Sequence, residues 1–197
     1  MSVIVAIKNG DHVIVGCDSQ VTAGYCKKTL TNKNNYKIFK PVKDKDLIIG
    51  VCGSLRDRDI LFCIDEYIEE IVKLKNEVNY KYIVTNIVPG IFEILSNNKR
   101  ILDIKDKLKI MEIEFVFIYK NQIYKVANNG CVIEIDDYCA IGSGSDYAIG
   151  YLNECDKTDI KEALIKSIKS SCKNDLHVNY PIIVMNSEND DIEIIEK

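Results

Sequence analysis

Hydrophobic and polar positions along the chain predict two strand-rich halves, each followed by helices. The run 2–8 is apolar and β-branched, Asn9-Gly10-Asp11 is a tight-turn signal, and the run 12–17 is apolar again. We therefore expect the chain to open with a β-hairpin. The near-continuous apolar run 47–52 predicts a strand whose two faces are both covered.

Between these strands lies the polar segment 19–35, which predicts a loop or an irregular pair of short strands, followed by a short strand at 36–39. Apolar residues at helical spacing then predict a long amphipathic helix over 55–75. Ser54 is its expected N-cap, and Asp57 is the expected second arm of a capping box.

A further helix is expected over 80–97, with a kink or break at Pro89-Gly90, and 98–109 reads as a helix end and a loop. Helices are also expected after Gly142-Ser143-Gly144-Ser145 and from an N-cap at Thr158 to about 173. The first four of the later strands are expected to form an antiparallel meander. These later strands are predicted at 111–119, 122–126, 131–135, 138–141, 180–185 and 192–195.

The order of elements predicts an α+β fold, since strands, two helices, strands, two helices and strands follow one another. Two antiparallel sheets flanked by helix pairs, a four-layer α/β/β/α sandwich, satisfy this order. The length of 197 residues suits one domain over 1–197.

Composition excludes several classes of function. The net charge is −4 and the basic residues are dispersed, so we expect neither nucleic acid nor an anionic membrane as partner. No apolar run approaches 18 residues, and Met1 leads directly into the first strand, so we expect a cytoplasmic protein without a secretory leader. The 8 cysteines form no CxxC pair, which predicts reduced, mostly buried thiols and neither a metal nor another cofactor.

The candidate chemistry lies at the start of the chain. The hairpin returns the end of its second strand to the start of its first, so Asp18 is expected near Ser2. If Met1 is removed, the free α-amine of Ser2, with a pKa of roughly 7.7–8.0, can accept the proton of the serine hydroxyl. Taken alone, Ser2 is more simply a small residue that permits methionine removal, and Asp18 a turn residue.

Four motifs in order carry a resemblance to a known family: Ser2-Val-Ile-Val-Ala, Val13-Ile-Val-Gly-Cys-Asp-Ser-Gln-Val-Thr22, Gly50-Val-Cys-Gly-Ser54 and Ile141-Gly-Ser-Gly-Ser-Asp-Tyr-Ala148. Together they resemble proteasome β-subunits and the bacterial HslV-type peptidases, which are N-terminal-nucleophile hydrolases. The resemblance extends over essentially the whole chain. It implies a self-compartmentalising ring of subunits.

The resemblance also implies catalytic roles. Ser2 falls on the nucleophile, Lys37 on a lysine whose charge lowers the pKa of the amine and hydroxyl, and Asp18 on the carboxylate that holds this lysine. Gly53 falls on the glycine whose N–H forms the oxyanion hole. Ser143 falls on a serine near the amine of the nucleophile.

Other residues are implied to orient the site or bind substrate. Asp175 falls on the aspartate that orients the nucleophile's amine, and Thr22 on the residue that holds the substrate main chain. The residues implied to line the first specificity pocket are Val21, Asn35, Phe39, Val51 and Leu55. Because they are mostly apolar, we expect a preference for hydrophobic residues before the cut.

The chain departs from the family pattern at several points. The nucleophile is serine rather than threonine, only Met1 precedes it, Ser54 replaces a second glycine, and Val178 stands where a serine is usual. The segment between Thr22 and the expected lysine is also longer than usual.

We therefore expect a subunit of a homo-oligomeric ring that hydrolyses peptides or unfolded polypeptides, and the resemblance allows for an ATP-dependent unfoldase as partner. The alternatives are a catalytically silent ring subunit and an N-terminal-nucleophile amidohydrolase acting on small amides.

Overall fold

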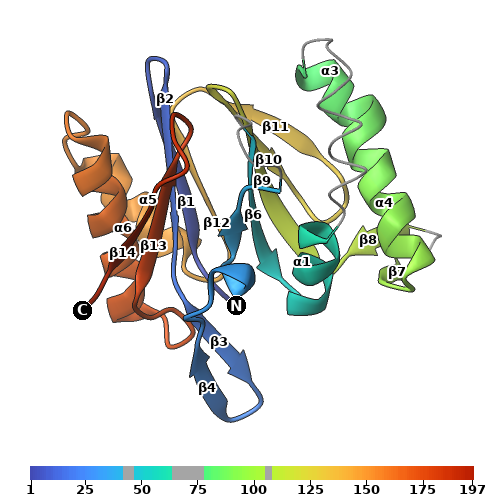
Figure 1. The fold of residues 1–197 in the computed structure, drawn as a ribbon, viewed down its shortest axis with the longest axis horizontal. Helices are drawn as coiled ribbons and strands as arrows, with labels where there is room; N and C mark the ends of the chain where they lie inside the picture. The colour runs from blue at the N-terminus through green and yellow to red at the C-terminus, as the bar shows by residue number, and fades with distance from the viewer. Residues whose placement is uncertain (42–46, 64–77, 105–107) are drawn as a thin grey trace.

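The structure is a computed structural model that describes residues 1–41, 47–63, 78–104 and 108–197 (Figure 1). Two five-stranded antiparallel sheets form its centre. Sheet one has the order β12-β1-β2-β13-β14 and sheet two the order β11-β10-β9-β6-β5. The strands of sheet one are β1 (Ile4–Asn9), β2 (His12–Cys17), β12 (Tyr138–Ile141), β13 (Ile182–Asn186) and β14 (Ile192–Ile195). Those of sheet two are β5 (Ile38–Phe39), β6 (Leu47–Gly53), β9 (Ile113–Tyr119), β10 (Gln122–Val126) and β11 (Val132–Ile135).

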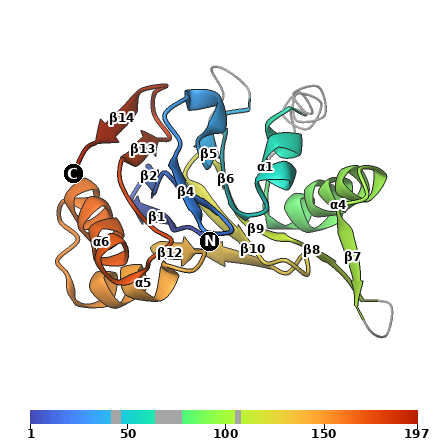
Figure 2. The same cartoon turned by 90° about the horizontal axis from the view of Figure 1, so that it is seen from below.

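Helices cover the outer face of each sheet, as both views show (Figures 1 and 2). Sheet one is covered by α5 (Ser145–Glu154) and α6 (Ile160–Asn174). Sheet two is covered by α1 (Leu55–Phe62) and α4 (Val88–Asn97). The expected four-layer α/β/β/α sandwich is therefore confirmed.

Three buried apolar clusters separate the four layers. Along β1, Ile4 and Ala6 point into the cluster between the sheets, while Val5 and Ile7 point into the cluster beneath α5 and α6. This alternation follows from the two-residue period of a strand. It explains why β1 and β6 are apolar along nearly their whole length, since both of their faces are covered.

The polar segment after Asp18 forms a separate two-stranded hairpin, β3 (Gln20–Ala23) and β4 (Cys26–Thr29), followed by the 3₁₀ turn Lys33–Asn35. This matches the expected irregular strand pair. The predicted helix over 55–75 begins as expected, with the Ser54 hydroxyl accepting from the Asp57 N–H at 3.4 Å. Its expected continuation over 64–75 lies outside the described residues.

The helix expected over 80–97 is interrupted earlier than Pro89-Gly90. It comprises α3 (Tyr80–Tyr82), a π-helical turn at Ile83–Ile87, and α4. Proline lacks an N–H, and its ring clashes with the carbonyl four residues earlier, which here belongs to the widened π-turn. The break therefore precedes the proline by one turn.

The segment 98–109 is not a helix end and loop. It contains β7 (Ile101–Ile104), which pairs with β8 (Leu108–Met111) in a hairpin that brings Ile101 opposite Met111. The apolar residues stand only at the base of this hairpin, so the charged residues between them concealed the strand pattern in the sequence.

Two further expectations are corrected. Strand β12 is not the fourth strand of a meander, because it crosses to sheet one and pairs with β1. There Cys139 and Ala140 are buried on opposite faces, whereas β11 is an edge strand that is mostly exposed. Helix α6 is capped by Asp159, which accepts from the Glu162 N–H at 2.9 Å, and not by Thr158.

Within the described ranges, no helix is both long enough and apolar enough to cross a membrane. The N-terminus lies near the middle of the molecule, between the two helix layers (Figures 1 and 2). The β1–β2 hairpin holds it there, because the Asp18 N–H donates to the Val3 carbonyl at 3.2 Å.

Candidate active site

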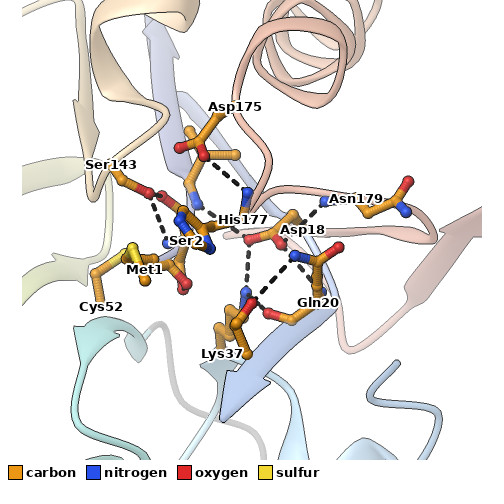
Figure 3. A network of polar contacts seen from close by, with 12 residues as sticks. Met1, Ser2, Asp18, Gln20, Lys37, Cys52, Ser143, Asp175, His177 and Asn179 are labelled. Atoms are coloured by element: carbon orange, nitrogen blue, oxygen red, sulfur yellow. Dashed lines mark hydrogen bonds and ion pairs between the residues drawn. The ribbon is translucent and has the colours of Figure 1, made fainter. Parts of the chain in front are cut away.

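Ser2 is held on both sides of its peptide backbone (Figure 3). Its N–H donates to the Ser143 hydroxyl at 3.2 Å, and its carbonyl accepts from the Gly144 N–H at 3.1 Å. The Ser2 hydroxyl donates to the Met1 carbonyl at 2.6 Å. The loop that opens α5 therefore fixes the residue from which the nucleophile is expected, and Met1 occupies the hydroxyl.

The Asp18 carboxylate is fully buried and receives four hydrogen bonds. One oxygen accepts from the Val3 N–H at 3.0 Å and from the Lys37 ammonium at 2.6 Å. The other accepts from the backbone N–H groups of Gln20 at 3.0 Å and Asn179 at 3.3 Å. Asp18 thus ties the residue beside Ser2 to three other segments.

Lys37 is equally buried and its ammonium has two acceptors. Besides Asp18, it donates to the Gln20 carbonyl at 2.7 Å. A buried lysine requires such partners, because desolvation of an unpaired charge is costly. The pair places a fixed positive charge one carboxylate away from the start of β1 (Figure 3).

Two glycines permit close approach in the site. Gly142 has φ of 90°, and a Cβ there would lie 2.4 Å from the Ser2 carbonyl oxygen and 2.9 Å from the Cys52 sulfur. Gly53 has φ of 117°, and a Cβ there would lie 2.2 Å from the Glu112 carbonyl oxygen. Only glycine suits both positions. Sequence reasoning quoted Gly142 within a motif but gave it no role.

Asp175 does not reach Ser2 through any hydrogen bond of the described residues. Its carboxylate accepts from the backbone N–H of His177 at 2.8 Å instead. Its own N–H donates to the Ser171 carbonyl at 2.8 Å, and the Ser171 hydroxyl donates to the Gly144 carbonyl at 2.7 Å. Ser171, which sequence reasoning did not single out, therefore links the Asp175 turn to the Ser143–Gly144 loop.

The residues expected to bind substrate are placed differently from one another. The Thr22 hydroxyl accepts from the Gln20 side-chain amide at 3.2 Å. Phe39 and Val51 are each only 3% exposed and belong to the core beneath α1. The remaining expected residues are partly or fully exposed: Val21 on β3, Asn35 in the 3₁₀ turn and Leu55 at the start of α1.

A cavity of about 380 Å³ lies beside Ser2. It is lined by Met1, Gly53, Gly142 and Ser143, with Glu112 and its neighbours as the opposite wall. Cys52 also lines it, but burial raises the pKa of this thiol far above its ordinary value, so it stays protonated. The hydroxyl of Ser2 is therefore the better nucleophile candidate at this cavity. In the part of the chain that the structure describes, no three His, Cys, Asp or Glu side chains gather as a metal site.

Comparison with known proteins agrees with this architecture. The family model "Proteasome subunit" matches residues 2–185. The ATP-dependent protease subunit HslV of Borrelia hermsii is 30% identical over 186 residues, covering 92% of this chain and 94% of that protein. HslV of Wolinella succinogenes is 27% identical over 164 residues, covering 81% and 82%.

Solved structures share the fold at low sequence identity. Thiobacillus denitrificans BPH in complex with epoxomicin matches with a TM-score of 0.70 and 16% identity, covering 99% of this chain and all of that chain. Eukaryotic HslV from Trypanosoma brucei matches with a TM-score of 0.67 and 18% identity, covering 93% and 98%. The chain belongs to the proteasome-subunit family of N-terminal-nucleophile hydrolases, which includes the HslV-type peptidases. The resemblance noted in the sequence is thereby confirmed.

Proposed function

We propose that this chain is a peptidase subunit that hydrolyses peptide bonds with Ser2 as its N-terminal nucleophile, once Met1 has been removed. The buried Lys37–Asp18 pair carries the proposal, because Asp18 also binds the N–H of the residue after Ser2. Apolar residues of similar volume often stabilise a core as well as a buried ion pair does. A charge retained at this position therefore favours a catalytic role.

Removal of Met1 supplies the base. While Met1 is attached, the nitrogen of Ser2 is an amide whose lone pair is delocalised and accepts no proton. After removal it is an amine, which takes the hydroxyl proton directly or through one water as the Ser2 oxygen attacks the scissile carbonyl. The positive charge of Lys37 favours the developing alkoxide.

The remaining steps return the proton and release the product. The Gly53 N–H donates to the oxyanion of the tetrahedral intermediate, and the protonated amine gives its proton to the leaving amine. This leaves an ester between the acyl group and Ser2. The amine then deprotonates a water that attacks the ester, and the hydroxyl of Ser2 is restored with release of the carboxylic acid.

We further propose that several copies form a ring in the cytoplasm, with unfolded polypeptides as substrates and an ATP-dependent unfoldase as partner. Supporting this, the curated relatives are ATP-dependent protease subunits of nearly the same length. A ring that admits only unfolded chains would restrict an otherwise unselective nucleophile.

A catalytically silent ring subunit is the second candidate. It is favoured by the Asp175 carboxylate, which binds the His177 N–H and no group of Ser2 among the described residues. Val178, at the position where the family pattern has serine, supplies no hydroxyl to that turn.

One fusion protein separates the two candidates. The chain is expressed behind a cleavable leader whose removal leaves Ser2 as the first residue, and hydrolysis of a fluorogenic peptide is measured before and after cleavage. We expect activity only after cleavage, and none in Ser2→Ala; Lys37→Ala combined with Ser2→Ala should lose little more than Ser2→Ala alone. Full activity of Ser2→Ala excludes the mechanism, and inactivity of the cleaved, ring-forming wild type favours the silent subunit.

A further inference from the structure

A second cluster of charged residues lies behind the cavity wall, on the far side of Gly53 from Ser2. Arg100, between α4 and β7, donates through its Nε to the Asp57 carboxylate. Through one terminal nitrogen it donates to the Ser54 hydroxyl at 3.0 Å and to the Glu112 carboxylate. One guanidinium thus joins the first turn of α1 to the residue that precedes β9.

These contacts converge on the turn formed by Gly53 and Ser54. The Ser54 N–H donates to the Glu112 carbonyl at 3.3 Å, and the Ser54 hydroxyl accepts from the Asp57 N–H. Gly53 itself leaves no room for a Cβ against Glu112. The position of the turn, and of the Gly53 N–H, therefore depends on how closely this turn is held to Glu112.

The charges explain why a cation is needed here. Asp57 is fully buried, and Glu112 is a second carboxylate bound to the same guanidinium. Without Arg100, a buried carboxylate would lose its charged partner and two like charges would remain close together, which disfavours the closed turn. Hydrogen bonding to Asp57 raises the pKa of Arg100, so its charge is permanent.

We propose that Arg100 is a positioning residue that fixes the Gly53–Ser54 turn and thereby aims the Gly53 N–H at the substrate oxyanion. The inference rests on the proposed peptidase function, in which Gly53 is the oxyanion donor. Arg100 acts only through its neighbours, since none of its printed partners is Ser2, Asp18 or Lys37. A planar fork with several donors can hold three acceptors at once, which a lysine cannot do.

The test compares Arg100→Lys and Arg100→Ala with the wild type and with Arg56→Ala, a control that removes an exposed arginine from the same helix. All are prepared with Ser2 as the first residue. Two properties are measured: kcat and KM for a fluorogenic peptide, and hydrogen–deuterium exchange of the peptide covering 50–60. The backbone amides of Ser54 and Asp57 report opening of the turn, since each has a hydrogen-bond acceptor in the closed form.

We expect faster exchange at 50–60 in both Arg100 variants but not in Arg56→Ala. We expect kcat to fall about tenfold or more in Arg100→Ala and about threefold in Arg100→Lys, because a misplaced oxyanion donor weakens transition-state binding. KM should stay within about twofold, since ground-state binding is not affected. Arg100→Lys keeps the charge and decides the matter if Arg100→Ala does not fold.

Unchanged exchange in Arg100→Lys overturns the proposal, and so does faster exchange with unchanged kcat. An equal loss through KM also overturns it, because it would indicate altered substrate binding. If the wild type has no peptidase activity, the proposed function fails, but the exchange rates still decide whether Arg100 holds the turn.

Discussion

The buried ion pair can be broken from either side, and the structure predicts unequal losses of stability. In Lys37→Met, the Asp18 carboxylate keeps its three backbone N–H donors. In Asp18→Asn, the Lys37 ammonium keeps its charge but loses its counter-ion, and the Gln20 carbonyl is the remaining acceptor. The new amide also cannot accept at both ends, so its NH₂ faces N–H donors.

Published-scale magnitudes give the size of the difference. Removing one partner of a buried ion pair lowers the free energy of unfolding by about 3–5 kcal/mol. Lys37→Met should lie near about 3 kcal/mol, because three hydrogen bonds still stabilise the carboxylate. Asp18→Asn should lie near about 5 kcal/mol or above, because an uncompensated charge stays buried. For a chain of this size these losses correspond to melting temperatures lower by roughly 6–12 °C and 10–20 °C.

The assay is thermal unfolding of each variant at the same protein concentration, because association of subunits also shifts the midpoint. Lys166→Met is the matched control, since Lys166 pairs with Glu162 on the exposed face of α6 and its loss should cost at most about 0.5 kcal/mol. The reasoning is refuted if Lys37→Met destabilises as much as Asp18→Asn, or no more than Lys166→Met.

Three further outcomes are expected. Ser2→Thr should retain peptidase activity, because the hydroxyl and amine are kept, and its rate, like that of the wild type, should rise as pH passes the amine pKa of roughly 7.7–8.0; a rate profile flat from about pH 6 to pH 9 would contradict this. Gly142→Ala should lower kcat by at least about tenfold by displacing Ser2, whereas Gly150→Ala, whose Cβ meets nothing within 4 Å, should not. Burial raises the pKa of Cys17 to about 12, so at about pH 8 its thiol is protonated and should resist alkylation in the folded protein, while the exposed Cys26 reacts; mass spectrometry of the labelled peptides decides.

Much of the site's geometry could be predicted because it depends on local rules. A tight turn at Gly10, with φ of 61°, fixes the register of the first hairpin, and this register alone brings Asp18 back to Val3. The apolar runs of β1 and β6 likewise indicated strands covered on both faces.

The rest depends on contacts between distant segments. Strand β12 could join either sheet by its pattern, and only the burial available beside β1 decides the choice. The bridge from Arg100 to Ser54 spans 46 positions and carries no periodic signal in the sequence. The hydrogen bond from the His177 N–H to Asp175 depends on how the turn after α6 closes, which residue identity does not specify.

The most direct test of the central claim is the mass of the first tryptic peptide after the active protein has been inactivated by a peptidyl β-lactone, which acylates hydroxyl nucleophiles. Trypsin cleaves after Lys8, so the fragment 2–8 reports both processing and modification. The account predicts a fragment that begins at Ser2, lacks Met1 and carries one lactone-derived acyl group in proportion to the activity lost. Complete inactivation with an unmodified 2–8 fragment, or full activity while Met1 is retained, would contradict it.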